Sequence, residues 1–116
     1  MSQNLNMDNI VFRKEIINCL VPNFRQDDRF FLLVGDMGFA VIDELRDEFP
    51  NRIINYGIME QAAVGIAAGM AMSGLKPIVY TIVNFLVFRA LEQVKNDVVL
   101  HNLNVKFIGT GANDYF

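Results

Sequence analysis

The chain has 116 residues, of which 53% are hydrophobic and 20% are charged, and it carries a net charge of −3. This composition indicates one globular domain with a single core, and it excludes a disordered chain and a basic surface for nucleic acid. One cysteine and one histidine exclude an internal disulfide and a zinc site and fit a cytoplasmic protein, and no apolar run reaches the roughly 20 residues of a membrane-spanning helix.

The N-terminal segment, residues 1–29, is expected to form a helix and a loop ahead of the main domain. Asp8 or Asn9 can cap this helix, because both side chains accept hydrogen bonds from the first N–H groups of a helix. Apolar residues then recur at helical spacing to about Leu20. Pro22 is expected to end the helix, because proline has no N–H group to donate.

The main domain, residues 30–116, alternates between apolar runs that predict strands and amphipathic stretches that predict helices. The expected strands are residues 30–34, 52–56, 77–82 and 105–108, and the expected helices are residues 42–49, 59–72 and 87–98. Turns or loops are expected at residues 35–38, 83–85 and 109–111. The alternation predicts an α/β fold, with a doubly wound and mostly parallel sheet and helices on both faces. No helix follows the fourth strand, so the domain is expected to be truncated after it.

The two later helices differ in the surroundings that we expect for them. The helix over residues 59–72 carries small apolar residues on several sides, so it could be buried all round, and Gly74 is well placed to end it. The residues of the last helix expected to face the core are Val87, Ala90 or Leu91, Val94 and Val98, and those expected to face away are Arg89, Glu92, Gln93 and Asn96.

Glu60 stands where the second predicted strand gives way to the small-residue helix. Ligands of open α/β sheets bind outside the carboxyl ends of the strands, so this is a favoured position for a functional acid. The alternative is an ordinary acid in the first turn of a helix, where the helix dipole favours negative charge. The apolar neighbours Ile58, Ala62 and Ala63 disfavour the charged carboxylate, and such an acid can share a proton with a ligand nitrogen.

Five further side chains each have a functional and a simpler interpretation. Asp36 could be a ligand-binding acid, but a turn-forming aspartate is favoured. Phe85 and Phe88 follow the third strand and are either core residues or an aromatic wall for a flat ring. His101 is favoured as a residue placed against the dipole of a helix end. Cys19 lies in the first helical pattern, so we expect a packed thiol rather than a reactive one.

Several blocks along the sequence resemble the pyrimidine-binding domain of transketolase-like thiamine-diphosphate enzymes. That group includes transketolase, 1-deoxyxylulose-5-phosphate synthase and the β-subunits of 2-oxo-acid dehydrogenases. The block with the most specific resemblance is Gly57-Ile58-Met59-Glu60-Gln61, continued by the run from Val64 to Ala71. The other matching blocks are residues 34–38, 49–52, 74–79 and 84–90, the pair Glu92-Gln93 and the pair Asn96-Asp97. The resemblance extends over roughly residues 30–116.

The resemblance implies a catalytic role for Glu60. In the family, this glutamate forms a hydrogen bond with N1′ of the cofactor's aminopyrimidine and favours the imino tautomer, which takes the proton from C2 of the thiazolium. Phe85 and Phe88 resemble the aromatic wall against the pyrimidine ring, with Phe88 favoured for the closest contact. Met59 and Asp36 are the remaining positions at which the resemblance implies cofactor contacts. No residue of this chain is expected to bind metal.

The resemblance also implies that the chain works with a partner. The family binds the diphosphate and Mg²⁺ of the cofactor through a Gly-Asp-Gly motif in a separate domain, and Gly35-Asp36-Met37 is not that motif. A diphosphate-binding domain or subunit, in a homo- or hetero-oligomer, would therefore supply Mg²⁺. The implied reaction is ketol transfer between sugars, with two alternatives: a fragment of a 2-oxo-acid dehydrogenase β-subunit, and a non-catalytic interaction subunit. Ala62 replaces a histidine or asparagine that often follows Glu-Gln in the family, and the isolated chain is expected to be inactive.

Overall fold

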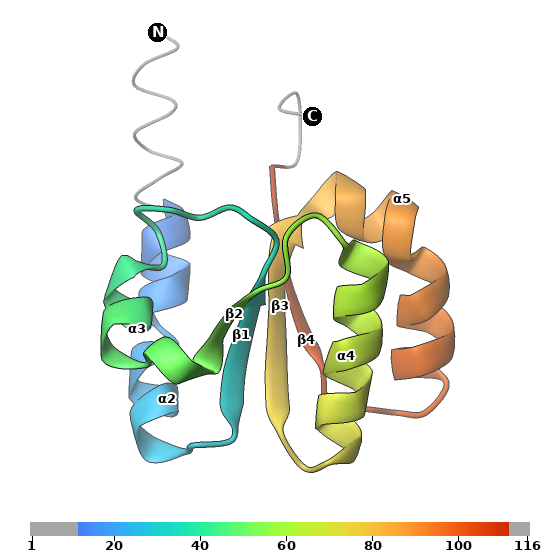
Figure 1. Cartoon of the computed structure of the whole chain (residues 1–116), viewed down its shortest axis with the longest axis horizontal. Coiled ribbons are helices and arrows are strands. Elements are labelled where there is room, and N and C mark those ends of the chain that lie inside the picture. Colours follow the sequence, from blue (N-terminus) through green and yellow to red (C-terminus); the bar gives the residue numbers. More distant parts are fainter. Residues whose placement is uncertain (1–11, 112–116) are drawn as a thin grey trace, which may run out of the picture.

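The computed structural model describes residues 12–111 and contains one four-stranded sheet. Its strands are β1 (Phe30–Val34), β2 (Ile53–Asn55), β3 (Lys76–Ile82) and β4 (Lys106–Thr110), in the order β2-β1-β3-β4. All neighbouring strands are parallel (Figure 1). The predicted parallel α/β sheet is therefore confirmed, and its first strand has the predicted bounds.

Helices cover both faces of this sheet, as predicted (Figure 1). One face carries a helical turn at residues 12–18, then α2 (Val21–Gln26), α3 (Asp43–Glu48) and the short 3₁₀ helix η1 (Pro50–Arg52). The other face carries α4 (Glu60–Met72), α5 (Val83–Gln93) and the π-helical turn η2 (Val94–Val99). Within residues 12–111 no helix is long and apolar enough to cross a membrane.

The two central strands, β1 and β3, are largely buried on both sides, so the fold has a core on each face of the sheet. Successive residues of a strand point to opposite faces. The core under α4 and α5 includes Leu33, Val79, Ala63, Val64, Ala67, Leu86, Ala90 and Val98. The core on the other face includes Ile17, Phe24, Leu32, Val34, Leu45, Ile78 and Tyr80. This explains why β1 and β3 read as continuous apolar runs rather than as alternating patterns.

The N-terminal segment differs from the prediction at Pro22. A second helix, α2, begins at Val21, with Pro22 in its first turn, where the missing N–H group costs nothing because it would have no helical partner. Asp8 and Asn9, the expected caps, lie outside the described residues. The expectation of a packed Cys19 was wrong, because this side chain is exposed.

Three expected boundaries in the main domain were also wrong. The loop expected at residues 83–85 is absent, because the chain passes directly from β3 into α5 at Val83. Gly109, expected in a turn, lies within β4, where the lack of a side chain lets Val83 approach closely. β2 is shorter than predicted, and Ile54 and Asn55 are exposed, because β2 pairs only with β1 and forms the edge of the sheet.

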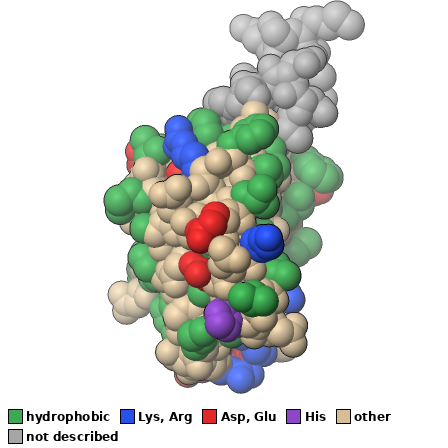
Figure 2. Space-filling model, turned by 90° about the vertical axis from the view of Figure 1, so that its right-hand side faces the viewer, with side chains coloured by type: hydrophobic (Ala, Val, Ile, Leu, Met, Phe, Trp, Pro, Cys, Tyr) green, Lys and Arg blue, Asp and Glu red, His purple; other side chains and the backbone are tan. Residues whose placement is uncertain are grey.

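The outer surfaces of α4 and α5 carry more apolar side chains than we expected from the sequence. The helix α4 is not buried all round: Ile66 and Met72 are exposed. In α5 and η2 the buried residues include Leu86, Ala90 and Val98, so of the alternatives Ala90 and Leu91 it is Ala90 that faces the core, while Leu91 is exposed. Val87, expected to face the core, is also exposed. Figure 2 shows hydrophobic side chains exposed among few charged ones on this side of the molecule.

Candidate functional site

The loops after β1 and β2 meet at the carboxyl edge of the sheet, where Asn55 joins them. Its Oδ1 accepts hydrogen bonds from the backbone N–H of Asp36 (3.1 Å) and of Gly57 (2.8 Å), and its Nδ2 donates to Oδ1 of Asp36 (3.3 Å). The backbone of Asp36 has a φ of 46°, which residues other than glycine rarely adopt. The hydrogen bonds to Asn55 hold it in this conformation. Asn55 thus ties the loop after β1 to the loop after β2, and the second of these loops leads to the first turn of α4.

Glu60 is the first residue of α4 and is only 3% exposed. The preceding turn contains Gly57 at a φ of 75°, which glycine adopts without strain. The first N–H groups of a helix are free of helical partners, and together with the helix dipole they favour a carboxylate at this position. The structure therefore buries the predicted acid at the carboxyl edge of the sheet, beside the end of β2.

Arg89, from the middle of α5, reaches this carboxylate. Its Nη1 lies 3.3 Å from Oε2 of Glu60, and its Cζ lies over the ring of Phe85, 4.2 Å from the ring centroid. Its backbone oxygen accepts a hydrogen bond of 2.8 Å from Nε2 of Gln61. Helical spacing in the sequence placed Arg89 on an outward face and did not reveal this contact, although Arg89 lies within a block that carries the family resemblance.

A hollow of about 360 Å³ opens beside this ion pair. It is lined by Ile58, Met59, Glu60, Gln61, Ala62 and Arg89. Two of the predicted site residues, Met59 and Glu60, thus lie together at the hollow, and Phe85 is linked to it through Arg89. Asp36 lies at the neighbouring loop and does not line the hollow.

Phe88 lies one residue before Arg89 in α5, and its side chain is 84% exposed. The interpretation of Phe88 as a core residue was therefore wrong. Phe85 is partly buried, under the guanidinium of Arg89. An exposed aromatic ring of this size is available to a ligand or to a second protein surface.

Two buried hydroxyl groups lie beneath the carboxyl edge. The phenol of Tyr56 packs on the backbone of Gly35, where an added Cβ would lie 2.6 Å from the phenol oxygen. Burial raises the pKa of Tyr56 above its ordinary value, and the nearby charge of Glu60 adds to this effect. The hydroxyl of Thr81 lies close to the phenol and partly offsets this rise in the pKa of Tyr56.

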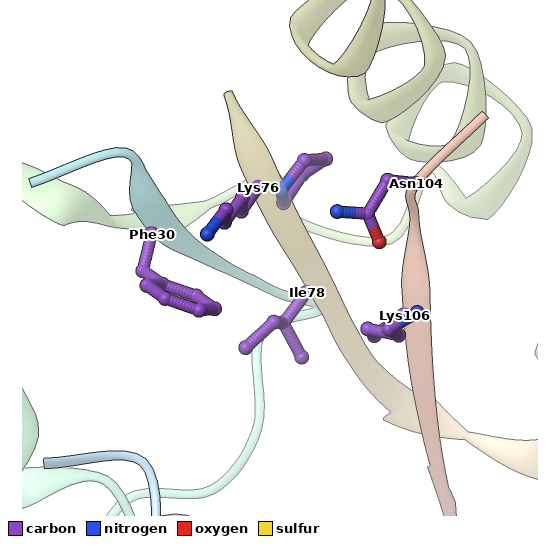
Figure 3. Close-up of a pocket in the computed structure, with 6 residues that line it drawn as sticks. Phe30, Lys76, Ile78, Asn104 and Lys106 are labelled. Atoms are coloured by element: carbon purple, nitrogen blue, oxygen red, sulfur yellow. The ribbon is translucent and has the colours of Figure 1, made fainter. Parts of the chain in front are cut away.

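A second hollow, of about 250 Å³, lies at the opposite edge, where β1, β3 and β4 begin. Figure 3 shows side chains from all three strands around it, including Phe30, Lys76 and Lys106. Its Lys76 already pairs with Asp27, at 2.8 Å between Nζ and Oδ2, and lies 5.0 Å from the centroid of the Phe30 ring. Since ligands of open α/β sheets bind at the carboxyl edge, the hollow beside Glu60 is the better candidate.

Comparison with known families identifies this arrangement. Residues 8–113 match the family model described as "Transketolase, pyrimidine binding domain". The chain belongs to the transketolase pyrimidine-binding domain family. The match covers most of the chain and confirms the resemblance drawn from the sequence.

Relatives in this family include subunits and longer enzymes. The chain is 39% identical over 104 residues to a subunit of the apulose-4-phosphate transketolase of Phocaeicola vulgatus, covering 89% of this chain and 33% of that protein. It is 46% identical over 99 residues to the 1-deoxy-D-xylulose-5-phosphate synthase of Clostridium tetani, covering 84% of this chain and 16% of that protein. The chain thus spans about a third or less of the length of these relatives.

A solved structure supports the same assignment. A chain described as "Split gene transketolase, inactive beta4 tetramer" matches with a TM-score of 0.76 and 30% sequence identity. The match covers 84% of this chain and 32% of that chain. The likeness therefore extends over most of the fold described above.

Proposed function

We propose that the chain is the pyrimidine-binding portion of a thiamine-diphosphate-dependent transketolase-like enzyme that transfers a ketol unit between sugars. The observation that carries this proposal is the buried carboxylate of Glu60 at the carboxyl edge, beside a hollow of about 360 Å³. The names of the relatives, an apulose-4-phosphate transketolase and a 1-deoxy-D-xylulose-5-phosphate synthase, support the same class of enzyme.

The residues around the hollow fit an aminopyrimidine. This ring is flat and largely apolar on its faces, with nitrogen atoms at its edge. The hollow offers one carboxylate among the apolar side chains of Ile58, Met59 and Ala62, and Phe85 and Phe88 lie nearby on α5.

We assign Glu60 the acid–base role in this site. When bound, thiamine diphosphate supplies a carbanion at C2 of its thiazolium, which attacks the carbonyl carbon of a donor. Glu60 would hold a proton at N1′ of the pyrimidine, and its burial keeps water from competing for that hydrogen bond. Met59 and Phe85 would flank the ring, Phe88 would cover it, and Asp36 would act from the neighbouring loop.

A partner would complete the site. The chain contains no Gly-Asp-Gly motif, so we propose that a second subunit or domain holds the diphosphate and supplies Mg²⁺. The exposed apolar side chains on α4, α5 and η2 are suited to such an assembly, and they include Ile66, Met72, Val87, Phe88, Leu91 and Val99. We further infer that the assembly is cytoplasmic, given the single free cysteine.

Substituting Phe88 by alanine should weaken cofactor binding to the assembled enzyme by about 1–3 kcal/mol, because ring contact and apolar burial are lost. The free energy of unfolding of the isolated chain should change by less than about 0.5 kcal/mol, because the side chain is 84% exposed. Calorimetric titration and chemical denaturation measure the two effects. Leu100→Ala, which removes another exposed apolar side chain, is the control. Unchanged affinity together with a large loss of stability would refute the role of Phe88.

Parallel assays of the assembled enzyme would test the reaction itself. The chain would be combined with a partner that carries the Gly-Asp-Gly motif, and then supplied with thiamine diphosphate, Mg²⁺ and either a ketose phosphate with an aldose acceptor or a 2-oxo acid. We expect two-carbon transfer from the ketose. Decarboxylation of the 2-oxo acid alone would favour the dehydrogenase alternative, and neither reaction despite cofactor binding would favour a non-catalytic subunit.

A further inference from the structure

The guanidinium of Arg89 lies where the carboxylate of Glu60 and the ring of Phe85 can be reached at once. Its Nη1 is 3.3 Å from Oε2 of Glu60, and its Cζ is 4.2 Å from the Phe85 centroid. The Glu60 side chain is 3% exposed, whereas that of Arg89 is 48% exposed. The accessible side of a buried carboxylate is therefore covered by a cation that reaches across from α5.

A guanidinium resembles an aminopyrimidine in shape and in how it can contact Glu60 and Phe85. It is flat, it carries N–H donors in its plane, and it stacks on aromatic rings. An aminopyrimidine bound to Glu60 would likewise direct a nitrogen edge at the carboxylate and lay a face against an aromatic ring. The two groups cannot use the same carboxylate oxygen and the same ring face together.

Resting on the proposed function, we propose that Arg89 occupies the seat of the pyrimidine ring in the free chain and has to leave Glu60 before the ring binds. The side chain of Arg89 thus lines the hollow and, in the free chain, blocks access of the pyrimidine ring to Glu60. Gln61 fixes the backbone of Arg89 through the bond to its carbonyl oxygen (2.8 Å), so the exchange involves the side chain alone.

The contacts of Arg89 allow this exchange. The separation of 3.3 Å from Glu60 is longer than the 2.7–2.9 Å typical of strong hydrogen bonds between charged groups. The Arg89 side chain is already about half exposed, so its guanidinium can be released into water. The cost of displacing it is that of one partly exposed ion pair and one cation–π contact, which corresponds to about a 5- to 30-fold reduction in ring affinity.

The test uses the chain assembled with its diphosphate-binding partner and two small probes. Thiamine, which lacks the diphosphate, reports on the ring seat, and methylguanidinium reports on the seat of the Arg89 side chain. Arg89→Met removes the charge and keeps the apolar stem, Arg89→Lys keeps the charge without the flat group, and Lys95→Met removes an exposed charge elsewhere as the control. Calorimetry measures both affinities, and circular dichroism checks that each variant is folded.

We expect Arg89→Met to bind thiamine about 5- to 30-fold more tightly than the unchanged chain, with Arg89→Lys intermediate and Lys95→Met unchanged. Methylguanidinium should bind to Arg89→Met, compete there with thiamine, and lose its affinity when Glu60→Gln is added. A residue that merely stabilises the helix pair would produce neither competition nor tighter binding.

Three results would overturn the proposal. Equal or weaker thiamine binding by Arg89→Met would show that Arg89 does not occupy the ring seat, while leaving the proposed function intact. Failure of methylguanidinium to bind Arg89→Met would show that the guanidinium seat does not exist. If thiamine bound neither form while methylguanidinium still bound Arg89→Met, the proposed function would fail, and Arg89 would be only the partner of a structural ion pair.

Discussion

In the assembled enzyme, Glu60→Gln should slow the exchange of the C2 proton of bound thiamine diphosphate by about 100- to 10,000-fold, the range typical of losing a positioned acid–base group. Glutamine has nearly the same shape as glutamate, but it cannot pass a proton to or from a ring nitrogen. Because Glu60 lies in the first turn of α4, with its N–H groups and Arg89 close by, the amide should find hydrogen-bond partners and the fold should persist. Exchange followed by NMR in deuterated buffer gives the rate directly.

Glu92→Gln is the matched control for this experiment. Glu92 lies one turn further along α5 from Arg89, is exposed, and accepts a hydrogen bond from Asn96 at 3.0 Å. Its substitution should leave the exchange rate within about twofold of the unchanged enzyme, as expected for a solvated surface acid. Exchange at the full rate in Glu60→Gln, with cofactor bound, would contradict the assigned role.

The sequence predicted the central strands well because β1 and β3 are largely buried on both faces. Residues 30–34 form one uninterrupted apolar run, and the structure gives β1 the same bounds. Elements without a polar boundary were harder to predict. The helix α5 starts at Val83 with Ile82 as its N-cap residue and no side-chain cap, so no turn residue marks the junction. Gly109 resembled a turn residue, but its role is to admit Val83 against β4.

The candidate site likewise has one residue that the sequence could predict and one that it could not. Glu60 could be predicted from local features: a strand end, a helix start and apolar neighbours. Arg89 could not, because its contact with Glu60 joins residues 29 positions apart and depends on how α5 packs across α4. Helical periodicity correctly gave Arg89 a direction away from the core, but a long arginine side chain can turn back along the surface. The same limit hid the packing of Tyr56 on Gly35.

The second large effect that we expect is a loss of cofactor affinity when the partner is absent. In the proposed site the hollow beside Glu60 holds the pyrimidine ring, and we propose that a partner domain holds the diphosphate and Mg²⁺. Without that domain the cofactor loses its charged contacts. We expect its affinity to fall by at least about 100-fold, or ~3 kcal/mol, when the partner is removed. The exposed apolar side chains of α4 and α5 should at the same time cause the isolated chain to self-associate.

Calorimetric titration of the purified chain with thiamine diphosphate and Mg²⁺, with and without the partner and paired with light scattering, tests this central claim most directly. Our account predicts that the chain alone forms oligomers and binds the cofactor weakly or not at all, and that adding the partner produces tight binding. A monodisperse monomer that binds thiamine diphosphate with micromolar affinity by itself would contradict it.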